Sequence, residues 1–93
     1  GVAREVLASY YLTGHRTASG AVFNPNGNTA ASWMYSLGTR VTVTNPHNGL
    51  SLSILINDTG PNGIARRMGA KLDLARGAAR RLGMSATSYV CVI

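Results

Sequence analysis

Few side chains in this 93-residue chain can perform acid–base chemistry. The acids are Glu5, Asp58 and Asp73, and the histidines are His15 and His47. Acid–base work on a sugar or an ester needs a carboxylate more often than any other group except histidine. Composition alone therefore limits the candidate acid–base catalysts to little more than these five residues.

Two of these acids are the strongest candidates, and each has two interpretations. Asp58, directly before Thr59-Gly60-Pro61, is a general acid if burial raises its pKa, or it only accepts hydrogen bonds from turn amides. Asp73 is a second acid, or it caps a helix that begins near Leu74, a favoured place for aspartate. If both face one groove, their repulsion pushes one of them toward protonation.

The other titratable groups are weaker candidates. We expect Glu5, near the start of the chain, to be a surface charge. His47 lies in Pro46-His47-Asn48-Gly49, a turn signal, and we expect it to be solvated. His15 lies in a glycine-containing loop, from which it could reach a ligand.

The chain is strongly basic, with a net charge of +6. Such a surface attracts nucleic acid, anionic lipid or acidic wall polymers, although it is also compatible with a solvated helix face. No nucleic-acid-binding motif is present, and the basic residues gather on and before one predicted helix, so we expect no nucleic-acid partner. Most of the charge falls within sixteen residues: Arg66, Arg67, Lys71, Arg76, Arg80 and Arg81.

Cys91 is the only cysteine, which excludes an intrachain disulfide and a cysteine-based metal site. We expect it to be a small buried apolar residue, with a free reactive thiol as the alternative. We expect no metal and no cofactor. No apolar run approaches the roughly 20 residues of a membrane helix, so we expect no membrane span, and a lipid anchor would lie outside this sequence.

The elements that must position the acids are mostly strands of a single domain, 1–93. Val6–Leu12 is predicted to be a strand and Thr13–Asn28 a long loop. Gly38–Asn45 alternates valine with polar residues and, through the Asn48-Gly49 turn, forms a hairpin with a second strand. In that second strand Leu50, Leu52, Ile54 and Ile56 share one face, and Ser51, Ser53 and Asn57 share the other.

One helix is predicted in the second half, over Leu74–Leu82, from the four-residue spacing of its apolar residues. Gly77 within it is expected to cost about 1 kcal/mol relative to alanine. Gly83 is expected to end the helix, and Tyr89–Ile93 to form a closing strand. This pattern predicts a small, mainly β barrel, and we expect a monomer.

An ordered set of short motifs carries a family resemblance over about residues 8–92. Each motif is weak alone, and the ordered set is specific. The chain resembles the rare lipoprotein A (RlpA) family in Ala8-Ser9-Tyr10-Tyr11, Thr17-Ala18-Ser19-Gly20, Phe23-Asn24-Pro25-Asn26, Thr29-Ala30-Ala31, Gly38–Asn45, Asn48-Gly49, Asn57-Asp58-Thr59-Gly60-Pro61, Leu72-Asp73-Leu74 and Ala78–Met84.

The resemblance implies a six-stranded double-psi β-barrel with one or two short helices, similar to the first domain of expansins and to barwin. It also implies a bacterial envelope protein, periplasmic, anchored to the outer membrane or secreted. Active members are lytic transglycosylases that cleave between N-acetylmuramic acid and N-acetylglucosamine, leave a 1,6-anhydro end and often prefer strands stripped of peptides. The implied partner is the peptidoglycan glycan strand.

The chain departs from the family where the resemblance places its active site. Ala21 stands where active members have a glutamate, and Ser32 where they have a histidine. Thr59 replaces the usual arginine, and Ala75 the usual serine. Asp58 is retained, so two of three implied active-site groups are replaced by residues that do not titrate usefully.

Two functions are therefore favoured, and an inhibitor or partner-protein role is the remaining alternative. A lytic transglycosylase needs only one acid/base, because the 6-hydroxyl of the sugar is the nucleophile, whereas a hydrolase generally needs two carboxylates. Asp58 and Asp73 are the expected catalytic residues of such an enzyme, and the alternative is a non-catalytic, expansin-like glycan-binding domain. Trp33 is expected to stack on a sugar, or else to fill the core. The expected substrate-binding residues are Tyr11, Thr17, Ser19, Ser32, Trp33 and Asn57.

Overall fold

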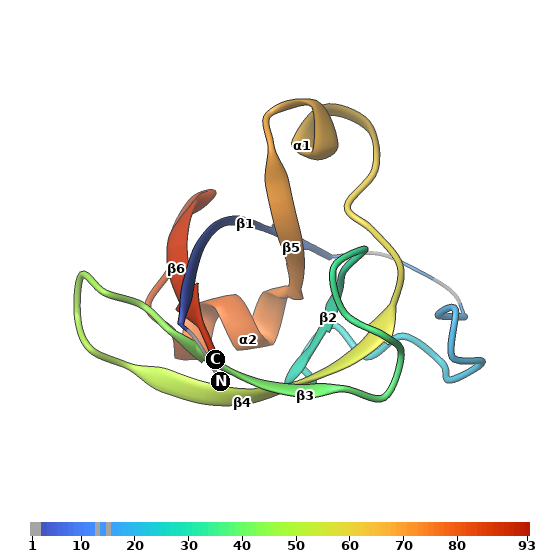
Figure 1. Cartoon of the computed structure of the whole chain (residues 1–93). Coiled ribbons are helices and arrows are strands. Elements are labelled where there is room, and N and C mark those ends of the chain that lie inside the picture. The colour runs from blue at the N-terminus through green and yellow to red at the C-terminus, as the bar shows by residue number, and fades with distance from the viewer. Residues whose placement is uncertain (1–2, 13, 15) are drawn as a thin grey trace.

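The computed structural model describes residues 3–12, 14 and 16–93, and in this part of the chain six strands close into a barrel (Figure 1). The strands pair in the order β1-β5-β2-β4-β3-β6. The pairs β1–β5 and β2–β4 are parallel, and the other pairs are antiparallel. The elements are β1 (Arg4–Tyr11), β2 (Thr29–Ala31), β3 (Arg40–Thr44), β4 (Ser51–Asp58), α1 (Gly63–Arg67), β5 (Ala70–Ala75), α2 (Arg76–Arg81) and β6 (Ser88–Val92). The predicted six-stranded double-psi β-barrel with short helices is confirmed.

The predicted hairpin is the antiparallel pair β3–β4. Val41 and Val43 are buried and Thr42 between them is exposed, as the alternation predicts. Gly49 has φ 78°, the left-handed conformation that glycine adopts without strain. Leu50 is predicted to share a face of this strand with Ile54 and Ile56, but it precedes β4 and is 47% exposed, whereas both isoleucines are buried.

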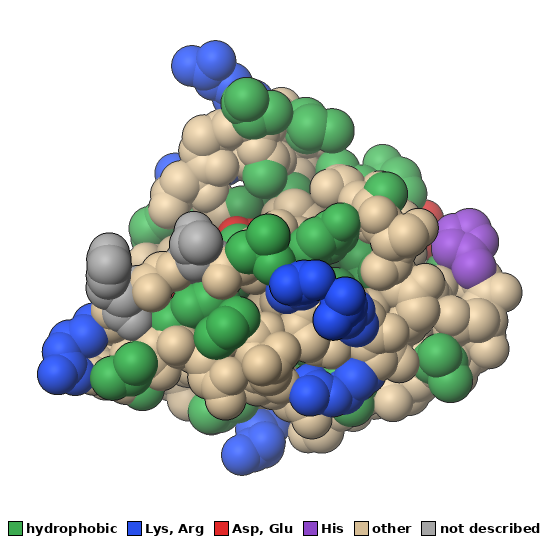
Figure 2. All heavy atoms as spheres, turned by 180° about the vertical axis from the view of Figure 1, so that it is seen from behind, with side chains coloured by type: hydrophobic (Ala, Val, Ile, Leu, Met, Phe, Trp, Pro, Cys, Tyr) green, Lys and Arg blue, Asp and Glu red, His purple; other side chains and the backbone are tan. Residues whose placement is uncertain are grey.

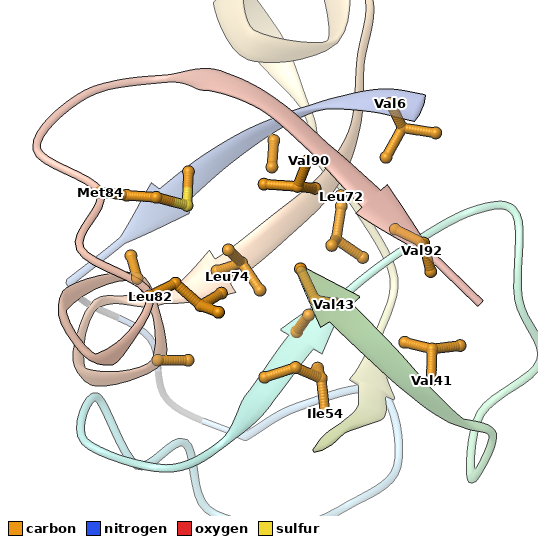
Figure 3. Packing of buried hydrophobic residues seen from close by; sticks show 14 of the residues in the cluster. Val6, Val41, Val43, Ile54, Leu72, Leu74, Leu82, Met84, Val90 and Val92 are labelled. Atoms are coloured by element: carbon orange, nitrogen blue, oxygen red, sulfur yellow. The ribbon is translucent and has the colours of Figure 1, made fainter. Parts of the chain in front are cut away.

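The core fills the inside of the barrel with aliphatic side chains from all six strands and from α2 (Figure 3). Because side chains alternate along a strand, each strand contributes every second residue to this core. Leu72 and Leu74 of β5 are buried, and Lys71 and Asp73 face the other way. Each strand of the barrel therefore has an apolar inner face that packs in the core and an outer face whose side chains can contact a ligand.

The predicted helix Leu74–Leu82 is wrong at its start, because Leu74 and Ala75 belong to β5 and α2 begins at Arg76. The four-residue spacing that suggested a helix joins a strand residue to helix residues, all of which point into one core. The predicted end is correct: Leu82 is the C-cap and Gly83, with φ 72°, follows it.

Gly77 plays a different part from the one expected. It is buried, and its N–H donates to the Pro25 carbonyl oxygen at 2.7 Å. A Cβ at this position would lie 2.6 Å from Asn26 Cα. Glycine therefore lets the loop before β2 approach the helix backbone.

The basic residues are split between the two ends of β5, although they are close in the sequence. Arg66 and Arg67 lie on α1, at one end of β5, and three arginines lie on α2, at the other end (Figure 1). Figure 2 likewise shows Lys and Arg side chains at several separate places on one face. The expected cluster on and before one helix is therefore wrong, because β5 separates its members.

Cys91 is half-buried, not fully buried, because it alternates with the buried Val90 and Val92 of β6.

In the described part of the chain, no helix has the length and apolarity required for a membrane crossing. Among the same residues, no group of three or more His, Cys, Asp or Glu side chains is placed to hold a metal ion.

Candidate functional site

A row of side chains crosses four neighbouring strands on the outer face of the barrel. Ala31 of β2 is in register with Asp73 of β5 on one side and with Asp58 of β4 on the other. Ser9 of β1 is in register with Asp73. Residues in register on neighbouring strands point to the same face of a sheet. The two aspartates therefore flank Ala31, and their backbones lie about 9.5 Å apart, which is two strand spacings.

A β-bulge places Asp58 in this row. Regular alternation after the buried Ile54 and Ile56 would turn Asp58 inward. The register instead shifts, because Ala30 pairs with Ile56 and the next residue, Ala31, pairs with Asp58. Asn57 is therefore the extra residue in β4. Bulges commonly redirect a side chain next to an active site. This one brings the Asp58 carboxyl to the outer face.

Both aspartates line one cavity of about 210 Å³. The long loop before β2 covers one side of it, and the segment after β4 forms the other side. We call this cavity the aspartate groove. Its lining residues are Tyr11, Gly14, Arg16, Phe23, Ala31, Asp58, Thr59, Gly60, Pro61, Asn62 and Asp73.

The Asp58 carboxylate is anchored by backbone amides. Its Oδ1 accepts hydrogen bonds from the Ala18 N–H at 2.9 Å and from the Thr59 N–H at 2.8 Å. The interpretation that Asp58 binds turn amides is therefore correct, and the same side chain also lines the groove. Through these bonds, Asp58 ties the loop that carries Ala18 to the end of β4.

Asp73 has a different environment. Its Oδ1 accepts a hydrogen bond from Ser9 Oγ at 2.9 Å. Burial raises the pKa of Asp73, the nearby charge of Asp58 raises it further, and the Ser9 hydrogen bond opposes both effects. It does not cap a helix, since Ala75 is the N-cap of α2 and makes no side-chain cap bond. Asp73 therefore holds its proton to higher pH than an aspartate of ordinary pKa does.

Tyr11 packs beside both carboxyls. Its ring stacks on Phe23, with centroids 4.5 Å apart and an interplanar angle of 18°. Burial, and then the charges of Asp58 and Asp73, raise the pKa of Tyr11, so its hydroxyl keeps its proton. This hydroxyl is buried and has no hydrogen-bond partner among the described residues. It can donate to an oxygen of a bound molecule. Tyr10 points to the opposite face and donates to the Ser85 carbonyl oxygen at 3.2 Å.

Thr17, Ser19 and Asn57 lie close to the groove but are not part of its lining. The Thr17 and Ser19 hydroxyls bond each other at 2.8 Å, and the Ser19 N–H donates to the Asn57 carbonyl oxygen at 3.2 Å. Asn57 is buried, and its Oδ1 has no partner among the described residues. These three residues hold the loop against β4, next to the Asp58 carboxylate.

Ser32 and Trp33 do not line the aspartate groove. Ser32 is 1% exposed; its hydroxyl donates to the Lys71 carbonyl oxygen and accepts from the Met34 N–H, both at 3.0 Å. Ser32 therefore fixes the chain after β2 and offers no surface to a substrate. Trp33 is 52% exposed, so it does not fill the core.

Sequence reasoning missed three residues of the site: Ser9, Arg16 and Phe23. Ser9 was part of a recognised motif, but only the β1–β5 register shows that it faces Asp73. Arg16 brings a cation to the groove lining, and its guanidinium donates to the Gly20 carbonyl oxygen at 3.0 Å. Ala21 is exposed and lies outside the lining, and His15 lies outside the described residues.

Comparisons with known proteins agree with this architecture. A family model described as "Lytic transglycolase" matches residues 3–92. A protein of Nostoc sp. named "Probable endolytic peptidoglycan transglycosylase RlpA" is 46% identical over 83 residues, which are 84% of this chain and 21% of the relative. The "Endolytic peptidoglycan transglycosylase RlpA" of Pasteurella multocida is 40% identical over 87 residues, 90% of this chain and 28% of the relative. The chain thus spans about a quarter of the length of these relatives.

A solved structure, the Streptomyces papain inhibitor, superposes with a TM-score of 0.73 and 16% sequence identity. The match covers 99% of this chain and 93% of the inhibitor. At this identity the likeness shows a shared barrel fold alone.

Proposed function

We propose that this chain, which belongs to the lytic transglycolase family, cleaves peptidoglycan glycan strands in the aspartate groove. The observation that carries this proposal is the register of Asp58 and Asp73 on either side of Ala31, because it directs both carboxyls into one cavity. The relatives named as peptidoglycan transglycosylases supply the substrate class. That substrate places the protein in the bacterial cell envelope, where we expect it to act as a monomer.

The raised pKa of Asp73 suits it to the role of general acid. Protonated Asp73 gives its proton to the glycosidic oxygen, and the bond from that oxygen to C1 of the muramic sugar breaks. The 6-hydroxyl of the same sugar attacks C1, closes the 1,6-anhydro ring and loses its proton to a carboxylate of the pair. No water molecule needs activation, so the exchange balances without a third catalytic carboxylate. A raised pKa keeps an acid of this kind protonated closer to neutral pH.

The anchoring of Asp58 gives it a complementary part. Two backbone amides hold its carboxylate in place, so its negative charge is fixed on the groove wall. A fixed negative charge stabilises the positive charge that develops on the sugar ring in the transition state. The protonated Tyr11 hydroxyl and the Arg16 guanidinium are available to bind sugar oxygens. With these groups, the reaction does not require a carboxylate at Ala21.

A second candidate function is a non-catalytic glycan-binding domain. Ala21 and Ser32 favour it, because neither supplies a group that titrates usefully and the Ser32 hydroxyl is committed to backbone bonds. In this alternative the groove binds a glycan strand and leaves it intact.

Digestion of sacculi, analysed by mass spectrometry, separates the two candidates. We expect 1,6-anhydro products from the wild type and a 100-fold to 10,000-fold lower rate from Asp73→Asn, the range for loss of general acid–base help. Asn keeps an oxygen that can accept the Ser9 hydrogen bond, so its fold should be intact. The control is Arg80→Gln on the exposed surface of α2, which should retain full activity.

Each other outcome is informative. Full activity in Asp73→Asn would refute the acid role of Asp73. Absence of products from the wild type, with protein that still pellets on sacculi at low salt, would establish the binding domain. Absence of pelleting on any wall preparation would exclude that alternative as well.

A further inference from the structure

A second hollow lies beside the aspartate groove, on the same outer face of the barrel. Lys71 precedes Asp73 by two residues in β5, so both side chains point outward and their Cα atoms lie about 6.6 Å apart. Lys71 and Met34 together line a cavity of about 580 Å³ near the start of β1 and a smaller one of about 140 Å³ beside Trp33. These cavities and the aspartate groove are therefore lined by neighbouring outward residues of the same strand, β5.

Trp33 is held in a fixed position between the aspartate groove and the 140 Å³ cavity that it lines. Its Nε1–H donates to the Pro61 carbonyl oxygen at 2.9 Å, and Pro61 also lines the aspartate groove. The Arg66 guanidinium carbon lies 5.1 Å from the centroid of the Trp33 ring. The indole remains 52% exposed, so it offers apolar surface on which a sugar ring can stack. A preorganised aromatic of this kind loses little conformational freedom on binding.

The charge around this aromatic is mostly positive. Arg4, Lys71 and Arg66 line the two cavities, and Glu5 is the one acid in their described lining. Exposed methionines also line these cavities, with Met34 at 36% and Met68 at 62%. Apolar surface with an excess of cations fits a sugar that carries a carboxylate better than a neutral sugar.

We propose that a second subsite, the Trp33 subsite, binds a carboxylate-bearing sugar. This sugar belongs to the same polymer that occupies the aspartate groove. The subsite is formed by Trp33, Met34, Arg66, Met68 and Lys71. The proposal rests on the proposed function, which supplies the polymer. N-acetylmuramic acid carries a lactyl group whose carboxylate is free wherever the stem peptide has been removed, so a peptide-free strand offers such a sugar at every second position. Lys71 provides the positive charge, and Trp33 provides the stacking surface.

The test measures binding of two soluble tetrasaccharides that alternate N-acetylglucosamine with N-acetylmuramic acid. One has free lactyl carboxylates, and the other has the same carboxylates as methyl esters. Trp33 is the only tryptophan, so its fluorescence reports binding directly. We expect the free acid to bind the wild type more tightly than the ester, and Lys71→Gln to weaken binding of the free acid about fivefold, as expected for loss of an exposed ion pair. Binding of the ester should not change.

A second variant tests the aromatic, and a third is the control. Trp33→Phe should weaken both tetrasaccharides, measured by calorimetry because the fluorophore is lost. Arg80→Gln on α2 removes one positive charge away from the subsite and should leave both affinities unchanged. Equal effects of Lys71→Gln on acid and ester, or no binding of the free acid to the wild type, would overturn the proposal.

The same variants separate this proposal from the proposed function. If Lys71→Gln discriminates between acid and ester while sacculi yield no anhydro products, the subsite is supported and the enzymatic function fails. If sacculi are cleaved and Lys71→Gln binds both tetrasaccharides as the wild type does, the enzymatic function stands and the Trp33 subsite is refuted.

Discussion

The two faces of the six-residue strand β5 present different residues and serve different purposes. The inner face presents Leu72 and Leu74, which are 1% and 0% exposed, to the core. On the outer face, Lys71 lines the 580 Å³ cavity and Asp73 lines the aspartate groove. The inner row contributes to stability, and the proposed chemistry uses the outer row, one residue apart. Substitutions on this strand should therefore separate folding from activity.

The largest effect on folding is expected from the inner face. Leu72→Ala removes a fully buried side chain and leaves a cavity, so we expect the free energy of unfolding to fall by about 2–5 kcal/mol. Urea denaturation measures this change. Lys71→Gln, the neighbouring outer residue, is the control and should stay within about 0.5 kcal/mol of the wild type. Equal losses of unfolding free energy in both variants would show that the inner face contributes no more to stability than the outer face does.

The next effect concerns the contact between α2 and the loop that covers the groove. Gly77→Ala in an exposed helix would stabilise by about 1 kcal/mol. Here the new Cβ meets the Asn26 backbone at 2.6 Å, so we expect a loss of about 1–3 kcal/mol instead. Thermal unfolding decides the sign. A higher melting temperature would show that the loop and helix separate easily.

Ser9→Ala sharpens the comparison on the outer row. The Ser9 hydroxyl donates to Asp73 and lowers its pKa, so its removal should raise that pKa further. If Asp73 is the general acid, the alkaline limb of the pH–rate profile moves to higher pH. The matched control is Ser53→Ala, an exposed residue of β4, which should leave the profile in place. A shift to lower pH would contradict the assignment.

The smallest expected effect has an unusual sign. Burial raises the pKa of Asp73 in the folded state above its ordinary value of 3.8. The stability that protonated Asp73 contributes is present below about pH 3.8 and is lost as pH rises through the folded pKa. Asp73→Asn carries no such charge, so its melting temperature should exceed that of the wild type at pH 7 by a small amount. The difference should vanish near pH 3, which thermal unfolding at both pH values can check.

Local patterns predicted the parts of the fold that depend on neighbouring residues. The β3–β4 hairpin was recognised because alternating valines and an Asn-Gly turn are close in sequence. β2 was not predicted as a strand, because three residues, Thr29–Ala31, are too few to show a period. The start of α2 was misplaced because Leu74 points into the same core from the end of β5.

The candidate site shows the same limit. Scarcity of acids singled out Asp58 and Asp73, which do line one groove. The sequence could not place them on one face, because that arrangement depends on the bulge at Asn57 and on pairings between distant strands. The burial of Ser32 also follows from tertiary contacts, since its hydroxyl donates to the carbonyl oxygen of Lys71, 39 residues away.

The position of β1 in the barrel has a consequence for the order of folding. β1 pairs with β5 on one side and with β6 on the other, and Arg4 is in register with Val92. The barrel therefore cannot close until almost the whole stretch from Arg4 to Val92 has left the ribosome. Such non-local pairings give a high contact order, for which we expect folding in milliseconds to seconds. A ribosome-tethered chain that lacks β6 should remain sensitive to protease, and β1 should become protected only after β6 is released.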